Sequence, residues 1–463
     1  MKTVILWYRN DLRIHDLPAL ATAAQADFVV PVFIFSQSLL GGKHSSSNRN
    51  RFLLECLEEL KSSLQNLGAD LVVRQGKPEE ALLKLMQETG ATEVICTKDF
   101  TPFAVNRDER VSAMINDHGY GFTQLPGRLA IDSFDGLVTG SGGPYKVFTP
   151  FWRKWEGISR REISQIPISL KLPNQLEVGS LPTLTNITKF ENLAVNPLKG
   201  GEKAARERMN TWLQSGIFEY DATHDLLGRD ATSRLSSYLH FGCLSVRELE
   251  TLIPDGEGPA AWHRQLCWRD FYHYIIKQFP ANAQLEYQER YREMKWSYDE
   301  ELLWAWKEGR TGYPVVDAAM RQLLSEGWMH NRARLIVGSF LTKDLGLDWR
   351  LGEQHFMKYL IDGDQANNNG NWQWIASVGV DPAPIFRRLY NPTRQQERYD
   401  EEGIYVRKYV PELAKVDLKY LAEPSKMSEA EQKATECMIG TDYPLPIVDH
   451  AKARDEALAR YRS

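Results

Sequence analysis

The chain has 463 residues, of which 43% are hydrophobic, and this length is enough to bury large cores in two domains. Its formal net charge of −5 excludes a chain that is basic overall, so nucleic-acid binding would need a local basic patch. The five cysteines form no C-x-x-C pair, which argues against a metal site or disulfide scaffold and fits a reducing cytosol. The longest apolar run, Phe28–Phe35, is far shorter than the roughly 20 residues of a membrane helix.

Strand and helix patterns alternate over residues 1–133. Strands are predicted where β-branched and aromatic residues form short runs, and helices where apolar residues recur at helical spacing. The predicted strands are Thr3–Tyr8, Phe28–Phe35, Ala69–Arg74 and Glu93–Thr97, and the predicted helices are Asn50–Leu67, Pro78–Thr89 and Asn106–His118. This alternation predicts an α/β domain with a doubly wound parallel sheet. No G-x-G-x-x-G or G-x-x-x-x-G-K-[ST] motif follows a strand, which argues against a standard dinucleotide or P-loop site.

The next segment, residues 134–201, changes character. Gly, Ser and Pro cluster near its start, several further Pro residues follow, and long periodic runs are few. We interpret it as a long linker that wraps the first domain, with one helix near Phe151–Ile163. Helical patterns dominate residues 202–463, where nine of the 13 Trp lie between Trp262 and Trp374. This last region is predicted to form an all-α domain.

Two polar segments of the helical region carry the chemistry. Asp362–Trp374 reads D-G-D-Q-A-N-N-N-G-N-W-Q-W, which is too polar for a core and too aromatic for an ordinary loop. It suits a pocket for a flat, hydrogen-bonding, redox-active ring. Thr232–Ser236 opens a predicted helix, whose free N–H groups favour an anion, although a plain N-cap is the alternative interpretation.

These segments resemble the flavin-binding core of the photolyase/cryptochrome family, and the resemblance covers essentially the whole chain. Trp268–Tyr272, Thr311–Pro314 and Gly327–Arg332 also carry it, and class I cyclobutane pyrimidine dimer (CPD) photolyases are most similar. The resemblance implies light-driven repair of CPDs in DNA, by electron transfer from photoexcited reduced FAD to a flipped-out dimer. The alternatives are a cryptochrome-type blue-light photoreceptor with weak or no repair, and an electron-transfer flavoprotein without a DNA partner.

The resemblance places an FAD site in the helical domain. Thr232–Ser236 would cradle the pyrophosphate, and the pair Arg334–Asp362 would lie beside the isoalloxazine, where a fixed Arg offsets the charge of reduced flavin. Asn368 would face flavin N5, at a position where photolyases usually carry Asn, plant cryptochromes Asp and animal cryptochromes Cys. The full implied set is Tyr220, Thr232, Ser233, Arg234, Leu235, Ser236, Arg334, Asp362, Asp364 and Asn368.

Three tryptophans, Trp372, Trp349 and Trp296, match the electron-transfer triad of the family. Indole is oxidisable, so a chain of Trp can carry a hole from a photoexcited flavin to the surface. Three Trp in a helical domain are more often core packing. The functional interpretation therefore rests on the alignment, which has no gap from Trp296 to Trp372.

Trp268 and Trp374 match the two Trp that wrap the flipped dimer, and Asn331 matches an Asn that contacts substrate. Two positions depart from the class I pattern, because Gln265 stands where those photolyases carry Glu and Leu335 where they carry Met. Gln keeps the size of Glu but loses its ionisable group, and Leu loses the polarisable sulfur. These departures weaken the repair assignment without reversing it.

Backbone contacts to DNA are implied for Arg269, Arg332 and Arg387. The run that contains Arg387 is one residue longer than the family pattern, so Arg388 could exchange roles with it. The resemblance also implies a monomer that acts in the bacterial cytoplasm, associated with the nucleoid when it acts on DNA.

A second, antenna chromophore is left open. Asn106 matches a position that contacts methenyltetrahydrofolate in folate-type enzymes, but Arg107 follows where a Glu would be expected. A folate, a deazaflavin, another flavin or no second chromophore are the alternatives.

Overall fold

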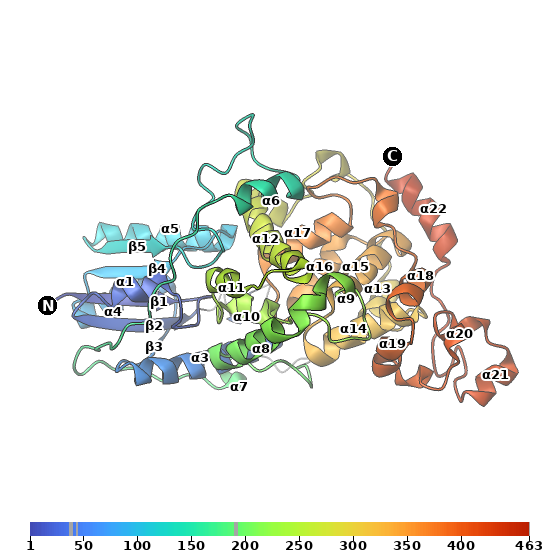
Figure 1. Cartoon of the computed structure of the whole chain (residues 1–463), viewed down its shortest axis with the longest axis horizontal. Helices are drawn as coiled ribbons and strands as arrows, with labels where there is room; N and C mark the ends of the chain where they lie inside the picture. Colours follow the sequence, from blue (N-terminus) through green and yellow to red (C-terminus); the bar gives the residue numbers. More distant parts are fainter. Residues whose placement is uncertain (37–39, 43–44, 189–192, 463) are drawn as a thin grey trace.

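The computed structural model describes residues 1–36, 40–42, 45–188 and 193–462 (Figure 1). Its strands form one five-stranded sheet in the order β3-β2-β1-β4-β5, and every neighbouring pair is parallel. The strands are β1 Thr3–Tyr8, β2 Phe28–Phe35, β3 Val72–Gln75, β4 Glu93–Thr97 and β5 Gly121–Leu125. The strand order reverses between β1 and β4, and the carboxyl ends of strands at such a point form a crevice that binds ligands in open α/β sheets.

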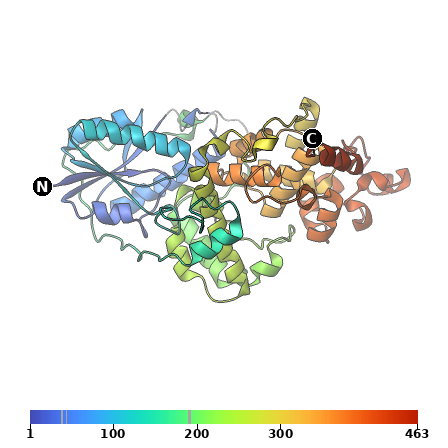
Figure 2. The same ribbon diagram turned by 90° about the horizontal axis from the view of Figure 1, so that it is seen from above.

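Helices cover both faces of the sheet (Figure 2). Successive residues of a strand point to opposite faces, so Val4, Leu6 and Tyr8 pack with α1 and α3, whereas Ile5 and Trp7 pack with α4 and α5. These helices are α1 Pro18–Ala23, α3 Ser47–Asn66, α4 Pro78–Thr89 and α5 Pro102–Asp117. The predicted doubly wound α/β fold is confirmed.

The element bounds differ from the prediction where local signals were weak or overlooked. β3 begins at Val72 rather than Ala69, because the N–H of Ala69 still closes the turn after α3 on Leu64 O. α5 begins at Pro102, where the Thr101 side chain caps the helix and Pro occupies its first turn. β5 was missed, since this edge strand reads G-F-T-Q-L and has no apolar run.

The linker, residues 134–201, runs back over the α/β domain. Its backbone carbonyls accept from the sheet region, since Val29 N–H donates to Lys171 O at 2.8 Å and Val73 N–H to Val178 O at 2.7 Å. It contains α6 Phe148–Glu156 and the short α7 Leu184–Ile187. α6 corresponds to the helix predicted at Phe151–Ile163, but it ends earlier, before Gly157. The domain bounds at 133/134 and 201/202 stay predictions.

Helices make up the described part of residues 202–463, which confirms the all-α prediction. No helix in the described ranges is long and apolar enough to cross a bilayer. The α-helices are α8 Glu202–Gln214, α9 Tyr220–Thr223, α10 Ser236–Phe241, α11 Val246–Leu252, α12 Glu257–Gln278, α13 Glu300–Lys307, α14 Pro314–Glu326, α15 Asn331–Ser339, α16 Trp349–Tyr359, α17 Gln365–Ile375, α18 Pro392–Tyr399, α19 Ile404–Tyr409, α20 Leu418–Leu421, α21 Glu429–Ala434 and α22 His450–Arg460. A π-helical turn, Phe340–Asp344, follows α15, and 3-10 turns lie at Gly216–Glu219, Pro280–Ala283, Glu289–Tyr291, Ile385–Arg388, Pro411–Leu413 and Pro424–Lys426.

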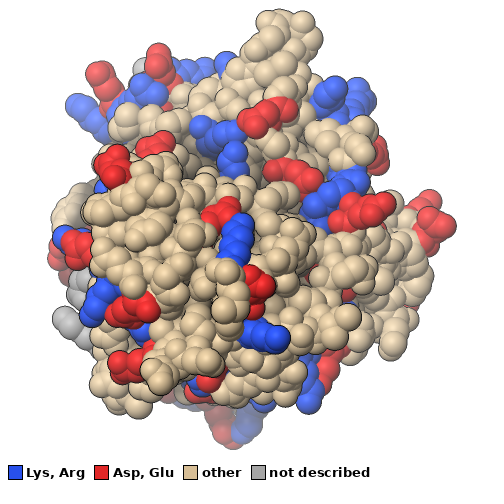
Figure 3. Space-filling view, turned by 90° about the vertical axis from the view of Figure 1, so that its left-hand side faces the viewer, with Lys and Arg blue, Asp and Glu red and all other residues tan. Residues whose placement is uncertain are grey.

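The outer end of the α/β domain carries charges of both signs. Over this face Lys and Arg are interspersed with Asp and Glu (Figure 3). Mixed charge of this kind keeps a surface soluble but does not build the positive potential that attracts a phosphate backbone. This face therefore does not suit a nucleic-acid backbone.

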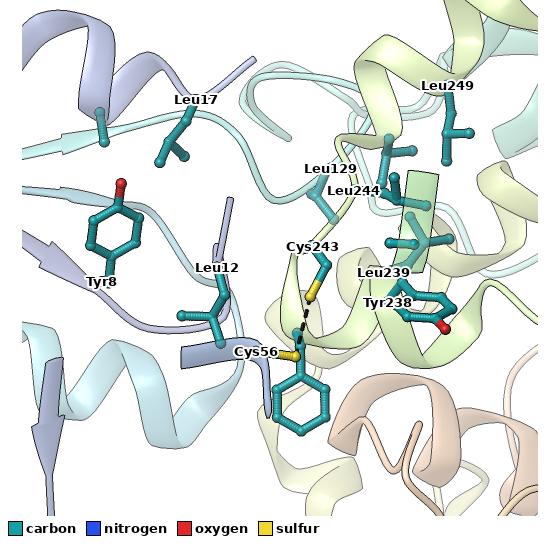
Figure 4. Packing of buried hydrophobic residues seen from close by; sticks show 14 of the residues in the cluster. Tyr8, Leu12, Leu17, Cys56, Leu129, Tyr238, Leu239, Cys243, Leu244 and Leu249 are labelled. Atoms are coloured by element: carbon teal, nitrogen blue, oxygen red, sulfur yellow. Dashed lines mark hydrogen bonds between the residues drawn. The ribbon is translucent and has the colours of Figure 1, made fainter. Parts of the chain in front are cut away.

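The two domains share one hydrophobic core (Figure 4). Cys56 of α3 meets Cys243, just after α10, with their sulfurs 3.4 Å apart, and both are free thiols. Phe52 of α3 packs its ring 5.1 Å from that of Phe241. Burial, followed by the neighbouring Cys243 thiol, raises the pKa of the Cys56 thiol, so the Cys56 sulfur is not in the reactive thiolate form. These apolar contacts fix α10 beside the α/β domain.

Candidate active site

A cavity of about 240 Å³ opens between α10, α12, α15, α16 and α17. It brings together residues that lie up to 142 positions apart in the chain, from Ser233 to Ile375, because α17 packs on both α12 and α16. Most of the predicted flavin and substrate residues line it, namely Ser233, Leu235, Ser236, Gln265, Arg269, Asn331, Arg334, Leu335, Asp362, Asp364, Asn368 and Trp372. The D-G-D-Q-A-N sequence fixes where α17 begins, because the Asp364 side chain caps this helix by accepting from Asn367 N–H at 3.0 Å.

Arg334 and Asp362 form an ion pair on the cavity wall, with 2.8 Å between Nη2 and Oδ2. The second carboxylate oxygen, Oδ1 of Asp362, is buried and has no hydrogen-bond partner among the described residues. A buried acceptor of this kind calls for a donor. The residues present therefore fit a ligand that donates a hydrogen bond into this wall, as the N–H group of a flavin ring would.

Asp364 lies at the centre of a buried cluster of basic groups. Its Oδ2 is 3.1 Å from Arg128 Nη2, 3.5 Å from His273 Nε2 and 3.6 Å from His240 Nδ1. Burial opposes ionisation, but His273, His240 and Arg128 together hold the pKa of Asp364 well below its usual range. Burial also lowers the pKa of His240. Neither this cluster nor any other group of three or more His, Cys, Asp or Glu in the described ranges could hold a metal ion.

The Asn368 amide is held in one orientation. Its Nδ2 donates to the backbone carbonyl of Glu353 at 3.0 Å, and the neighbouring Asn369 donates to the Glu353 side chain at 3.0 Å. Oδ1 of Asn368 is thereby left as an acceptor beside the cavity that Asn368 lines. An amide oxygen at this point can accept a hydrogen bond but cannot supply a proton as an acid would.

Of the three tryptophans of the predicted triad, Trp372 and Trp349 are buried and Trp296 is half-buried. Trp372 lines the cavity and its ring contacts Phe356 at 5.0 Å. Trp349, at the start of α16, is 0% exposed and donates through Nε1 to Glu286. Trp296 is half-buried, and the next residue, Ser297, pairs with the backbone just before Trp349. Trp372 at the cavity and the half-buried Trp296 are compatible with the two ends of a hole relay.

The predicted substrate residues divide into two groups. Gln265 and Asn331 are exposed and Leu335 is half-buried, and all three line the cavity, which places them towards its mouth. Trp268 and Trp374 are half-buried and are not among the residues that line it, so their contact with the dimer stays a prediction. The Trp268 ring is stacked on Phe148 with centroids 3.7 Å apart, and the Trp374 ring is covered by an Arg388 guanidinium at 4.0 Å.

The four predicted DNA-contacting arginines are not equivalent. Arg388 is 2% exposed and donates to the carbonyls of Trp374 and Asp381, and Arg269 lines the cavity and donates to Arg128 O. Arg332 is partly buried and paired with Asp225, with 3.0 Å from Nε to Oδ1. Arg387 is the one that faces solvent.

The segment Thr232–Ser236 forms a wall between two cavities. Ser233, Leu235 and Ser236 line the cavity described above, whereas Thr232 and Arg234 line another behind it. No side chain of this segment caps α10, so the plain N-cap interpretation is wrong. Tyr220 lies on α9 and packs edge-on against Trp212 at 5.8 Å, and its flavin contact stays a prediction.

A larger cavity of about 520 Å³ lies at the carboxyl ends of β1, β2 and β4. Arg9 and Arg107 lie over the Trp7 ring there, at 4.6 and 5.0 Å, and Arg128 also lines it. Asp364 and His240 line this cavity as well as the first one. Sequence reasoning missed the cavity, because its residues come from separate strand ends and carry no local motif. Asn106, predicted to contact an antenna chromophore, is exposed and does not line this cavity, whereas its neighbour Arg107 does.

Comparisons with known proteins identify the family. The model of the FAD binding domain of DNA photolyase matches residues 262–463, and that of DNA photolyase matches residues 4–169. A deoxyribodipyrimidine photo-lyase of Streptomyces griseus is 39% identical, over 98% of both chains. This chain belongs to the photolyase/cryptochrome family. The predicted family is thereby confirmed, and the class I assignment within it stays a prediction.

Solved structures of the photolyase/cryptochrome family share the whole fold. A class III photolyase from Agrobacterium tumefaciens has a TM-score of 0.93 and 35% identity, covering 100% of this chain and 97% of that one. A cryptochrome from Synechocystis sp. PCC6803 has a TM-score of 0.90 and 28% identity, covering 100% and 99%. An archaeal photolyase from Sulfolobus tokodaii, solved with two FAD molecules, has a TM-score of 0.85 and 30% identity, covering 99% of each chain.

Proposed function

We propose that this chain repairs cyclobutane pyrimidine dimers in DNA when illuminated. One observation carries the proposal: most of the predicted flavin residues line the same cavity as the predicted substrate residues Gln265, Asn331 and Leu335, with Gln265 and Asn331 exposed at its mouth. Reduced FAD, when bound, would supply a light-excited electron that splits the cyclobutane ring and then returns to the flavin, so that the reaction has no net change of oxidation state. Loss of dimers from UV-irradiated DNA, measured in the light and in the dark, tests the proposal.

The chain's own residues hold and orient the reactants. Arg334 and Asp362 would set the edge of the flavin ring, with the partnerless Oδ1 of Asp362 as acceptor. The fixed Asn368 amide would present an acceptor without an acidic proton. Asp364 stays ionised because three basic groups surround it, so the negative charge needed to orient donors persists through the neutral pH range.

The cavity mouth would receive the dimer. A pyrimidine dimer extruded from the duplex loses stacking, and flat apolar side chains restore part of that free energy. The half-buried Trp268 and Trp374 would take this role, while Gln265 and Asn331 would offer amide groups to the pyrimidine edges. Leu335 contributes an apolar wall that excludes water.

We expect Gln265→Glu to raise the quantum yield of repair. Gln can hold the dimer by hydrogen bonds but cannot share a proton with the ring-opening radical anion, so unproductive electron return competes better. The dissociation constant for dimer DNA should change by less than about tenfold, or about 1.4 kcal/mol. The quantum yield is measured for the unaltered protein and for Gln265→Glu, both fully reduced and with saturating substrate.

Leu335→Met serves as the control for Gln265→Glu, because it restores the other family residue without adding an ionisable group. It should raise the yield less than Gln265→Glu does. A yield that does not rise in Gln265→Glu would show that proton sharing at this position is unimportant.

We expect Arg387→Ala to weaken DNA binding through a lost phosphate contact. Arg387 faces solvent, whereas Arg269, Arg332 and Arg388 are already engaged within the protein. The slope of log K against log salt should fall by about 0.7–0.9, the contribution of one phosphate. Arg110→Ala, an exposed Arg on α5, is the control and should leave the slope unaltered. An unchanged slope in Arg387→Ala would remove this residue from the interface.

A photoreceptor with weak repair is the second candidate. Gln265 and Leu335 depart from the CPD photolyase pattern, and the fold also matches a cryptochrome with a TM-score of 0.90. Asn368 and the exposed Arg387 favour repair. FAD binding with efficient photoreduction but no dimer loss in the light would decide for the photoreceptor.

We further propose that the cavity at the strand ends holds a second chromophore. Its Arg9, Arg107 and Arg128 suit an anionic or electron-rich aromatic ligand of folate, deazaflavin or flavin type, and the Sulfolobus tokodaii relative was solved with two FAD molecules. Extraction of the purified protein and identification of the released chromophores tests this. We also propose that the protein is a monomer that acts on DNA in the cytoplasm.

A further inference from the structure

Behind the Thr232–Ser236 segment lies a cavity of about 150 Å³ that the proposed repair chemistry does not use. Residues 227–230, α14, the turn before α15 and α19 enclose it. The cavity of about 240 Å³ that the predicted flavin residues line is called the flavin cavity below. Alternate residues of the segment face opposite ways, with Ser233 and Leu235 towards the flavin cavity and Thr232 and Arg234 towards the smaller one. One short segment of chain is therefore a wall of both cavities.

His330 lines the cavity and is 3% exposed. Its Nδ1 accepts from Arg332 N–H at 3.1 Å and so caps α15, which leaves the ring hydrogen on Nε2. That Nε2 is buried and has no partner among the described residues. Burial lowers the pKa of His330 to about 4, so the ring is neutral at pH 7. A buried N–H without an acceptor is unfavourable, and the cavity is the place from which an acceptor can reach it.

Cations outnumber carboxylates around this cavity. Arg229, Arg234 and Lys408 line it, and the neighbouring acids Asp230 and Glu326 are both already paired. Arg234 binds Asp230 through Nε at 2.9 Å and Glu326 through Nη1 at 3.0 Å. The Nζ of Lys408 lies 3.4 Å from Oε1 of Glu326. For Arg229 the described part of the chain offers no carboxylate within 4.0 Å. One positive charge is thus left over for a ligand.

The Arg234 guanidinium is held firmly in place. It lies 4.3 Å from the centroid of the Trp328 ring, and its backbone has a φ of 53°, which few residues other than Gly adopt. A side chain fixed by two carboxylates and an aromatic face loses little further freedom when a ligand binds. The cavity is therefore organised before any ligand arrives.

We propose that this cavity binds a phosphate group, as free phosphate or as the phosphate of a small nucleotide, and that the bound group strengthens FAD binding. A tetrahedral oxyanion can accept from His330 Nε2–H while it pairs with Arg229 and Lys408, which approach from different elements. Because one segment walls both cavities, a ligand that holds it in place favours the conformation that binds flavin. The coupling is reciprocal by thermodynamic necessity.

Calorimetric titration of the FAD-loaded protein with sodium phosphate at constant ionic strength tests the site. We expect one saturable site per chain, weakened about threefold by Arg229→Gln or by Lys408→Gln, as for exposed charge pairs. Lys452→Gln, on the exposed side of α22, is the control and should leave binding unchanged. His330→Asn keeps a capping side chain but removes the ring N–H, and should weaken binding about tenfold or more. A parallel titration with adenosine monophosphate separates a nucleotide site from a free-phosphate site.

The rate of FAD release, measured with and without saturating phosphate, tests the coupling. Release should be slower with phosphate, and His330→Asn should abolish the difference. Absence of saturable heat, or equal weakening by Lys452→Gln, would mean that the cavity holds water alone. Phosphate binding without any effect on FAD release would contradict the coupling. Both readouts are independent of dimer repair, so their failure is distinguishable from failure of the proposed function.

Discussion

Replacing Trp372 by Phe is expected to block light-driven reduction of oxidised FAD while sparing repair by chemically reduced protein. Trp372 is the member of the triad that lines the flavin cavity, and its Nε1 is buried without a partner among the described residues. Phe is much harder to oxidise than Trp, so the first hole transfer from the flavin fails. The initial rate of photoreduction should fall at least about tenfold, equivalent to about 1.4 kcal/mol in activation free energy.

The matched control for Trp372→Phe is Trp306→Phe. Trp306 is equally buried and its ring lies 6.2 Å from that of Trp372, but it is outside the predicted triad. This variant should photoreduce at close to the normal rate. If Trp372→Phe photoreduces normally, or if Trp306→Phe is just as slow, the electrons follow another route.

Gly352→Ala is expected to destabilise the protein, although Ala favours a helix interior over Gly by about 1 kcal/mol. Gly352 lies in α16 directly against Trp372, and an added Cβ would be only 2.5 Å from Cζ3 of that ring. The ring would have to shift into the flavin cavity or α16 would have to move. Overpacking of this kind costs about 1–3 kcal/mol. Chemical denaturation of the FAD-loaded protein measures the free energy of unfolding.

A double-mutant cycle isolates the clash behind the Gly352→Ala prediction. The atoms that an added Cβ would meet belong to the six-membered part of the indole, which Phe at position 372 cannot place there. In the Trp372→Phe background Gly352→Ala should therefore cost clearly less. An equal cost in both backgrounds would show that the destabilisation has another origin.

The sheet was predictable where its strands are buried on both faces. β1, β2 and β4 consist of nearly continuous apolar residues, and the predicted bounds agree with the structure. β5 pairs on one side only and its residues are half-buried, so no apolar run reveals it. Its position follows from pairing with β4, which is a tertiary property.

The candidate site was predictable where one local segment encodes it. The Asp362–Trp374 sequence carries its own signals, since Asp364 caps α17 and the Asn side chains are tied to Glu353. The partners of Asp364 were not predictable, because Arg128, His240 and His273 come from separate elements. Their convergence depends on how α10 and α12 pack against the α/β domain.

The arginines show the same limit in another form. Arg387 and Arg388 are adjacent in the chain and chemically identical, and the sequence could not say which one reaches DNA. In the folded protein Arg388 is buried over Trp374, which leaves Arg387 in solvent. Packing of Arg388 against the Trp374 ring decides which of the two arginines is exposed, and no pattern in the sequence predicts this packing.

Light-dependent loss of CPDs from a UV-irradiated thymine oligonucleotide is the most direct test of the repair assignment. The protein is loaded with FAD, reduced chemically and mixed with the oligonucleotide, and intact dimers are counted after equal times in blue light and in the dark. We predict that dimers disappear in the light, at a rate that depends on protein, and persist in the dark. Dimers that persist in the light, with protein that holds FAD and binds the oligonucleotide, would contradict repair and favour the photoreceptor.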